Sequence, residues 1–247
     1  MKKIAVIQDL SGLGKCSLTA AIPVISVMGV QAVPFPTAVL SNQTGYPSYY
    51  CDDYTEHMEQ IMTEWEKRKF SPDGIYTGFL ADEEQADKIL DFLRRFRTEN
   101  TMVLVDPVMG DNGSAYGIYT EGLREKMLQL VRNAHVITPN LTEALLLLYG
   151  KEEMEKRYAS LLELDGRKRL EQIGKIGEQL KKEYDPITGG FICGWKVKFS
   201  DNCTDKQAIQ IKINTQQSGS TAVRQISPWK LRLSGLEGCG TNPNMPG

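Results

Sequence analysis

The sequence predicts an α/β protein with a mainly parallel central sheet that helices cover on both faces. Short β-branched runs alternate with longer segments of helical period over about the first 150 residues, and such alternation is typical of parallel sheets. The composition, 41% hydrophobic and 24% charged, suffices for one sizeable core. Two expected strands end in a carboxylate or amide beside a proline, a pattern that places a functional site beyond the strand ends.

The first strand and helix units are expected in the N-terminal part. Residues 4–7 form a β-branched run typical of a strand buried on both faces, residues 8–14 a loop with two glycines, and residues 17–28 a helix that the next glycine ends. A second strand is expected over residues 31–35. The stretch after it is rich in Ser, Thr, Asn, Gly, Pro and Tyr, which predicts a loop with short edge structure over residues 36–52.

Further strand and helix pairs follow, and a charged helical region comes after them. Apolar residues at helical spacing predict the helices, and Asp82 is placed to cap one of them. The strands are expected over residues 74–77, 101–105 and 136–137. The helices are expected over residues 54–69, 82–97, 120–132, 142–149 and, as a charged region, 151–184.

The sequence changes character after residue 184. The later residues are rich in Gly, Ser, Thr, Asn and Gln, and only residues 208–213 alternate well enough to predict a strand. The stretch from about residue 234 has the glycines and prolines of a tail without regular structure. We therefore expect a core over residues 1–184 and an atypical C-terminal region over residues 185–247.

Charge and hydropathy argue against several classes of protein. The formal net charge is −2 and no long Lys/Arg block occurs, so we expect no nucleic-acid partner. No apolar run reaches the length of a membrane span, and the first residues lead into a strand pattern, so we expect a cytoplasmic protein without a membrane partner. The five cysteines show no C-x-x-C pair, which favours reduced thiols.

Polar side chains stand at the ends of three expected strands. A carboxylate such as Asp106, between an apolar strand and a proline, can coordinate hydrated Mg²⁺ or orient phosphate-bound water, and a turn or helix cap is its alternative role. Asn140 and Glu143 have the spacing of a capping box, whereas their functional role would place Glu143 near the metal of Asp106. Asp9, at the end of the first strand, is placed to touch a substrate.

Two loops offer further polar groups. The cluster of residues 41–46 could recognise a small polar ring or could simply be a solvated loop. Gly12 and Gly14 precede a helix and either bring N–H groups to an anion or form a tight turn, because no standard nucleotide fingerprint is present. The two histidines have no nucleophile or metal-ligand partner at a telling spacing, so no hydrolase triad is expected.

Five segments together resemble the pyridoxal/pyridoxamine kinases of the ribokinase superfamily. In chain order they read IQDLSGLGKCSLTAA (7–21), SNQTGY (41–46), TGFL (77–80), DPVMGDNG (106–113) and TPNLTEA (138–144). The resemblance implies a three-layer α/β/α ribokinase-like sandwich, ATP and Mg²⁺ as cosubstrates, a monovalent cation such as K⁺, and phosphorylation of the 5′-hydroxymethyl group of a B6 vitamer by a homodimer. A hydroxymethylpyrimidine kinase-like enzyme and a non-catalytic protein that binds a B6 vitamer or a nucleotide are the alternatives.

The resemblance also implies a group of substrate-binding residues. Asp9 falls where the family contacts the pyridine ring, commonly with Ser, so the preferred vitamer stays open. Thr44 matches a ring-binding threonine, and Phe79 replaces a tyrosine that is frequent in the pocket. Ser11 belongs to the same expected group.

A second implied group belongs to the nucleotide and the metal. Asp106, Asn140 and Thr188 match the positions that contact nucleotide and phosphate in the family. Asp106 and Glu143 match the magnesium group. The strand before Thr188 is poorly formed, because Pro186 stands where β-branched residues are expected.

One motif of the family is missing from the sequence. In the family a G-[TA]-G-D segment opens a late helix, where its amides form an anion hole for the migrating phosphoryl group and its Asp deprotonates the hydroxyl. The nearest remnant, residues 218–222, carries no aspartate. The catalytic base is therefore unknown, and Asp201 or Asp205 could substitute for it. We expect weak or absent turnover and interpret residues 185–247 as the product of a frameshift or of a truncated gene model.

Overall fold

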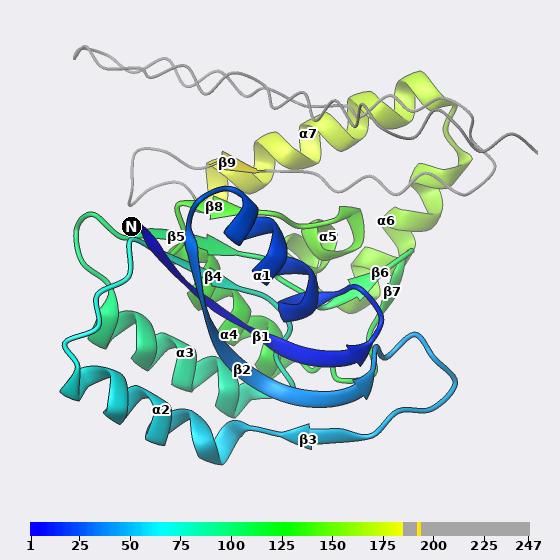
Figure 1. The fold of residues 1–247 in the computed structure, drawn as a ribbon. Coiled ribbons are helices and arrows are strands. Elements are labelled where there is room, and N and C mark those ends of the chain that lie inside the picture. Colours follow the sequence, from blue (N-terminus) through cyan, green and yellow to red (C-terminus); the bar gives the residue numbers. More distant parts are fainter. Residues whose placement is uncertain (185–191, 194–247) are drawn as a thin grey trace, which may run out of the picture. The chain divides into compact units, whose positions relative to one another are not determined.

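The computed structural model describes residues 1–184 and 192–193, and it confirms an α/β fold with a mainly parallel central sheet (Figure 1). Among these residues, seven strands form one sheet in the order β3-β2-β1-β4-β5-β8-β9, in which only the edge strand β3 runs antiparallel. The strands are β1 (Lys3–Leu13), β2 (Gln31–Asn42), β3 (Cys51–Asp53), β4 (Gly74–Thr77), β5 (Met102–Val105), β8 (Val136–Ile137) and β9 (Ile192–Cys193). A separate antiparallel hairpin, which the sequence analysis did not predict, consists of β6 (Gly110–Asp111) and β7 (Ser114–Ala115).

The helices confirm the expectation from apolar spacing. In the described part of the chain they are α1 (Ser17–Val27), α2 (Thr55–Lys67), α3 (Glu83–Phe96), α4 (Glu121–Arg132), α5 (Leu141–Tyr149), α6 (Lys151–Glu163) and α7 (Gly166–Tyr184). The expected cap is also present, because the carboxylate of Asp82 accepts a hydrogen bond from the backbone N–H of Gln85 at 2.9 Å. The charged region after residue 150 thus divides into two helices.

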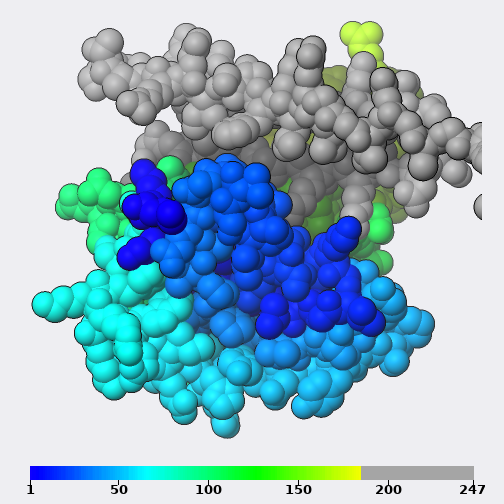
Figure 2. All heavy atoms as spheres, viewed as in Figure 1, coloured from blue at the N-terminus to red at the C-terminus, as the bar shows by residue number. Residues whose placement is uncertain are grey.

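The strand order reverses at β1. This strand pairs with β2 on one side and with β4 on the other, so the chain adds strands in opposite directions from it. The connection to β2 carries α1, whereas the connections to β4, β5 and β8 carry α2, α3 and α4. Right-handed crossovers in opposite directions place their helices on opposite faces of the sheet, and Figure 1 shows α1 on one face and α2 to α4 on the other. From the same viewpoint, Figure 2 shows the N-terminal residues, coloured blue, at the surface.

The main core lies between the sheet and the helices α2, α3 and α4. Alternate strand residues point into it, and each of the following is at most 1% exposed: Ala5, Ile7, Ile75, Val103, Val105 and Ile137. Phe92 of α3 contacts the rings of Phe35 and Trp65 edge-on, with centroids 5.2 and 6.0 Å apart. Val6 of β1 and Leu18 of α1 are also buried but do not belong to this cluster.

The first strand is longer than the sequence predicts. The loop expected over residues 8–14 is wrong for most of its length, because β1 continues to Leu13 and stays paired with β2 past one bulge. Gly12 permits this pairing, since a Cβ at that position would lie 2.6 Å from the carbonyl oxygen of Ser41. Backbone pairing with a neighbouring strand therefore overrides a local sequence that is typical of a turn.

The second strand is also longer than expected. β2 runs to Asn42, so the loop predicted from residue 36 is wrong over its first part, whereas the short edge strand β3 agrees with the expected edge structure. Pro34 and Pro36 do not interrupt β2, because β3 pairs with it only from Ala38 onwards and leaves the earlier N–H side without a neighbouring strand. Proline is compatible with a strand wherever no ladder bond is needed from it.

Cys16 and Cys51 are free thiols, as predicted. None of the helices that the structure describes is long and apolar enough to cross a membrane. The expected strand over residues 208–213, the expected tail from residue 234 and Thr188 lie outside the described residues.

Candidate functional site

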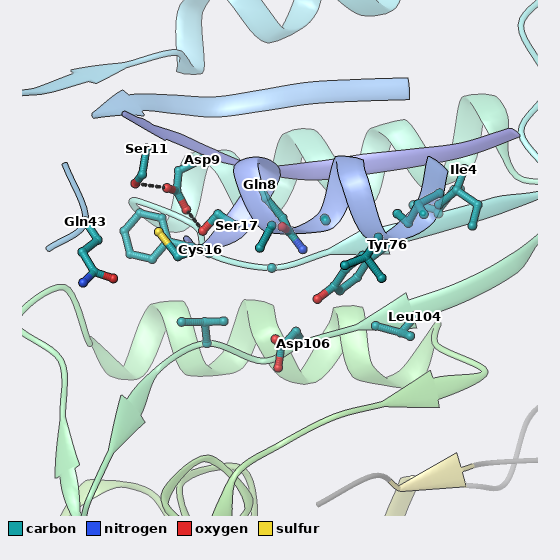
Figure 3. A pocket seen from close by; sticks show the side chains of 18 of the residues that line it. Ile4, Gln8, Asp9, Ser11, Cys16, Ser17, Gln43, Tyr76, Leu104 and Asp106 are labelled. Atoms are coloured by element: carbon teal, nitrogen blue, oxygen red, sulfur yellow. Dashed lines mark hydrogen bonds between the residues drawn. The ribbon is translucent and has the colours of Figure 1, made fainter. Parts of the chain in front are cut away.

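A cavity of about 1330 Å³ opens where the strand order reverses, beside α1 (Figure 3). Five side chains that the sequence analysis singled out line it: Asp9, Ser11, Thr44, Phe79 and Asp106. Two of them belong to β1, and the others come from the β2–β3 connection and from the segments after β4 and β5. The carboxyl ends of neighbouring parallel strands meet at one edge of the sheet, which is why residues so distant in the chain line one cavity.

Asp9 is held by two hydroxyl groups. Its buried carboxylate accepts hydrogen bonds from Oγ of Ser11 at 2.8 Å and from Oγ of Ser17 at 2.5 Å (Figure 3). Ser17 is the first residue of α1 and has a φ of +47°, a left-handed conformation that costs energy for a residue with a side chain. The start of α1 and the end of β1 together therefore orient an acceptor of hydrogen bonds inside the cavity.

A close approach between two strand ends shapes the middle of the cavity. Gln8 is buried, and its side chain lines the cavity together with that of Tyr76 of β4 (Figure 3). A Cβ on Gly78 would lie only 2.9 Å from Cγ of Gln8. The glycine after β4 therefore leaves the room that the Gln8 side chain occupies.

Asp106 connects the segment after β5 with the segment after β8. Its carboxylate is 6% exposed and accepts a hydrogen bond from Oγ1 of Thr138 at 3.0 Å. Its backbone N–H donates to the carbonyl oxygen of Thr77 at 2.9 Å, which fixes it to the end of β4. The segments after β5 and β8 therefore lie side by side, with a buried carboxylate facing the cavity.

Asn140 and Glu143 form the capping box that their spacing predicts. The side-chain oxygen of Asn140 accepts from the N–H of Glu143 at 2.9 Å, and the Glu143 carboxylate accepts from the N–H of Asn140 at 2.7 Å. The amide nitrogen of Asn140 also donates to the carbonyl oxygen of Gly110 at 2.8 Å, which ties the β6–β7 hairpin to α5. These two side chains do not line the cavity. Their positions therefore confirm the capping role and leave the nucleotide and metal roles as proposals.

Three carboxylates act on Tyr116, a side chain that lines the cavity. Burial raises the pKa of the Tyr116 phenol, and the carboxylates of Asp111, Glu143 and Asp106 raise it further. No cluster of three or more metal-ligating side chains occurs within residues 1–184. Magnesium at a phosphoryl-transfer site is usually held by one or two carboxylates together with substrate phosphates. Asp106 lines the cavity and fits that mode of binding, whereas Glu143 does not line it.

Several cavity residues were not expected from the sequence, among them Gln8, Ser17 and Tyr116. Ser17 could have been found, because a strand and the helix that follows it meet at the strand end. Tyr116 follows the unpredicted hairpin, and its N–H donates to the carbonyl oxygen of Met109 at 2.9 Å. No local pattern marks it, since only the folding of that hairpin turns it towards the cavity.

Comparisons with known proteins cover most of the described chain. The family model described as "Phosphomethylpyrimidine kinase" matches residues 14–182. The chain is 30% identical to the "Pyridoxine/pyridoxal/pyridoxamine kinase" of Bordetella avium over 139 residues, which are 53% of this chain and 46% of that protein. A phosphomethylpyrimidine kinase assigned in Bacteroides thetaiotaomicron and solved with pyridoxal is 44% identical, with a TM-score of 0.59 over 65% of this chain and 58% of that one. The pyridoxal kinase of Lactobacillus plantarum is 30% identical, with a TM-score of 0.56 over 60% of this chain and 52% of that one.

The similarity is confined to part of each relative. The chain spans about half the length of the curated relatives that it matches. The region matched by the family model contains Thr44, Phe79, Asp106, Asn140 and Glu143, and it ends at residue 182, close to where the composition changes.

Proposed function

The chain belongs to the phosphomethylpyrimidine kinase family, whose ribokinase-like fold it shares with pyridoxal kinases, and we propose that it binds a B6 vitamer and phosphorylates its 5′-hydroxymethyl group with ATP. The cavity that gathers Asp9, Ser11, Thr44 and Phe79 carries this proposal. It offers a small polar ring a carboxylate, two hydroxyl groups and an aromatic side chain from three separate segments. A few convergent polar groups in an otherwise apolar cavity are typical of small-molecule sites.

The two ends of the cavity have different proposed roles. Asp9 and its hydroxyl partners bind the pyridine ring, whereas Asp106 acts at the phosphate end, next to Thr138. Asp106 and Glu143 would hold Mg²⁺, which neutralises phosphate charge during phosphoryl transfer. Asn140 and Thr188 belong to the proposed nucleotide group, and a monovalent cation such as K⁺ is proposed on the family resemblance alone.

A second candidate, binding without turnover, is favoured by the missing G-[TA]-G-D segment. Phosphoryl transfer depends on positioned donors, on charge stabilisation and on an oriented nucleophile. The described part of the site supplies ring-binding groups and a phosphate-end carboxylate, and we assign no catalytic base in it. We therefore propose that vitamer binding persists and that turnover is reduced by roughly a thousandfold or more.

The test is a binding and turnover assay on the full 247-residue chain. Pyridoxal, pyridoxamine, pyridoxine and hydroxymethylpyrimidine are each titrated by calorimetry, and the phosphorylated product is quantified after incubation with ATP and Mg²⁺. We expect saturable binding of B6 vitamers with slow turnover. Turnover at ordinary enzyme rates would exclude the binding-only candidate, preferential phosphorylation of hydroxymethylpyrimidine would support that alternative enzyme, and absence of vitamer binding would overturn the proposal.

We propose a cytoplasmic homodimer, as the family resemblance implies. The C-terminal end of α1 supports an association surface, because Val27 and Met28, which directly follows the helix, are 90% and 56% exposed. Light scattering of the purified chain should give twice the monomer mass of 27.7 kDa. A monomer at micromolar concentration would contradict the proposal.

We also propose that residues 1–184 form the kinase core and that residues 185–247 are not a family C-terminus. The loss of the strand pattern and of the glycine-aspartate motif at the same boundary supports a frameshift or a truncated gene model. Sequencing the coding DNA tests it. One uninterrupted frame, with no other frame that encodes the motif, would refute it.

A further inference from the structure

Gln85, in the first turn of α3, is a fully buried polar side chain that does not line the cavity. Its amide nitrogen lies 2.8 Å from the carbonyl oxygen of Thr37, 2.9 Å from Oγ1 of Thr55 and 3.0 Å from Oδ1 of Asp53. Its amide oxygen accepts a hydrogen bond from the backbone N–H of Ala81 at 2.9 Å. One side chain therefore joins β2, the end of β3, the start of α2 and the segment after β4.

The segment after β4 forms one wall of the cavity. Phe79 lines the cavity, and its carbonyl oxygen accepts a hydrogen bond from Oγ1 of Thr37 at 3.2 Å. Two residues later, the N–H of Ala81 donates to Gln85. Both bonds come from buried side chains, so the backbone that carries the Phe79 ring is held on either side of it.

The β2–β3 connection forms a second wall. It carries Gln43, Thr44 and Tyr49, which line the cavity. Asp53 closes this connection at the end of β3, where it pairs with Ala38 of β2. Burial alone would raise the pKa of Asp53, but hydrogen bonds from Thr55 and Gln85 outweigh burial and lower it. The amide nitrogen of Gln85 thus reaches the backbone of β2 and the carboxylate that ends β3.

The chemistry of this position requires an amide. Gln85 stands three residues after the cap Asp82, where glutamate would be an ordinary partner in a capping box. Glutamate, however, would keep only the acceptor for Ala81 and would place a second carboxylate beside Asp53. Two N–H donors and one acceptor are needed at the same buried point, and a glutamine supplies all three.

We propose that Gln85 is a positioning residue for the ring-binding walls of the cavity. It keeps Phe79 and the β2–β3 connection at the spacing that a B6 ring needs, although it touches no ligand itself. Its removal takes one hydrogen bond each from the carbonyl oxygen of Thr37, the carboxylate of Asp53 and the N–H of Ala81. The first two keep another donor, the N–H of Tyr54 and the groups of Thr55. Ala81 loses the bond that ties its segment to α3, so the two walls are no longer held to one another. The inference rests on the proposed function for the identity of the ligand.

The first experiment compares Gln85→Met with the unmodified chain. Pyridoxal binding is measured by calorimetry, and backbone exchange is measured by hydrogen–deuterium exchange with mass spectrometry. We expect the dissociation constant for pyridoxal to rise by roughly tenfold or more, and the segments 78–81 and 43–50 to exchange faster. ATP affinity should not change, because the phosphate end of the cavity has no hydrogen bond to Gln85.

The matched control is Thr101→Val. Thr101 is another buried polar side chain that joins segments: it donates to the carbonyl oxygen of Pro72 at 3.0 Å and accepts from the N–H of Thr98 at 3.0 Å. It lies directly before β5, at the amino ends of the strands, and does not line the cavity. The control should lower the thermal midpoint without changing pyridoxal affinity or exchange in the two walls.

Two outcomes would overturn the inference. In the first, Gln85→Met binds pyridoxal as tightly as the unmodified chain; in the second, it loses no more affinity than Thr101→Val at equal stability. Should the unmodified chain bind no pyridoxal, the proposed function fails, and the exchange rates of the two walls still decide whether Gln85 positions them. Should Gln85→Met not fold, Thr37→Val removes only the bond to Phe79 and should give a smaller loss of affinity in the same direction.

Discussion

The two faces of the central sheet differ in how the described helices cover them. On the face towards α2, α3 and α4, strand residues such as Ile75 and Val103 are at most 1% exposed. On the face towards α1, Leu104 is half-buried and Met102 is 55% exposed, because α1 packs mainly against β1 and β2. The first face therefore carries most of the packing that stabilises the fold. The second carries the cavity, so changes there should affect binding more than stability.

The largest effect is expected on the covered face. Phe92→Ala should lower the free energy of unfolding by about 3–5 kcal/mol, because the ring is fully buried and packs against Phe35 and Phe96. Urea denaturation followed by circular dichroism measures it. Leu104→Ala, on the other face, is the control and should cost clearly less, since that side chain is half-buried. Equal losses for the two variants would contradict the comparison of the faces.

A smaller effect is expected on the cavity face, and it should change the affinity for pyridoxal and leave stability nearly unchanged. Asp9→Asn removes the charge at the ring end and should raise the dissociation constant for pyridoxal by roughly tenfold or more, with little change in the thermal midpoint. Asp73→Asn is a matched control, since Asp73 lines the far end of the same cavity and bonds the N–H of Lys3. An equal loss of affinity in both variants would show that overall charge, and not the Asp9 position, controls binding.

A pH effect is expected at the edge of the sheet opposite the cavity mouth. Nδ1 of His135 accepts a hydrogen bond from the N–H of Val103 at 3.0 Å, and burial, followed by the charge of Arg97, lowers the pKa of His135 below its usual value of 6.5. As the pH falls, the imidazole of His135 takes up its proton in the unfolded chain before it does so in the folded one. The contribution of His135 to the free energy of unfolding should therefore be constant above pH 6.5 and should decrease as the pH falls from there towards the lower folded pKa. Unfolding curves of the unmodified chain and of His135→Gln test this. An unchanged pH slope in the variant would refute the assignment.

The smallest effect is expected from an exposed residue of the cavity face. Met102→Ser should change the free energy of unfolding by no more than about 0.5 kcal/mol, because the side chain is 55% exposed. The neighbouring substitution Val103→Ser, which points into the covered core, should destabilise the fold several times more. Thermal unfolding of the two variants measures this difference in stability, which depends on the face of the sheet that each residue occupies.

The amino-acid sequence was sufficient for the features that depend on neighbours within a few residues. The apolar spacing of α3, its cap at Asp82 and the capping box of Asn140 and Glu143 are all local patterns, and each was predicted correctly. The order of the motifs also located Asp9, Thr44 and Asp106 in one cavity. Periodicity and strand ends are short-range signals, so a single sequence carries them.

Long-range pairing determined the rest. The local sequence of residues 8–13 predicts a turn, but pairing with β2 makes this segment a strand. Ser17 becomes a partner of Asp9 only when α1 folds back over β1. Gln85 reads as an ordinary residue of a helix start, yet its amide meets segments 30 and 48 residues away. Hydrogen bonds across such separations depend on where the sheet places each backbone atom, and no local pattern of residues encodes that placement.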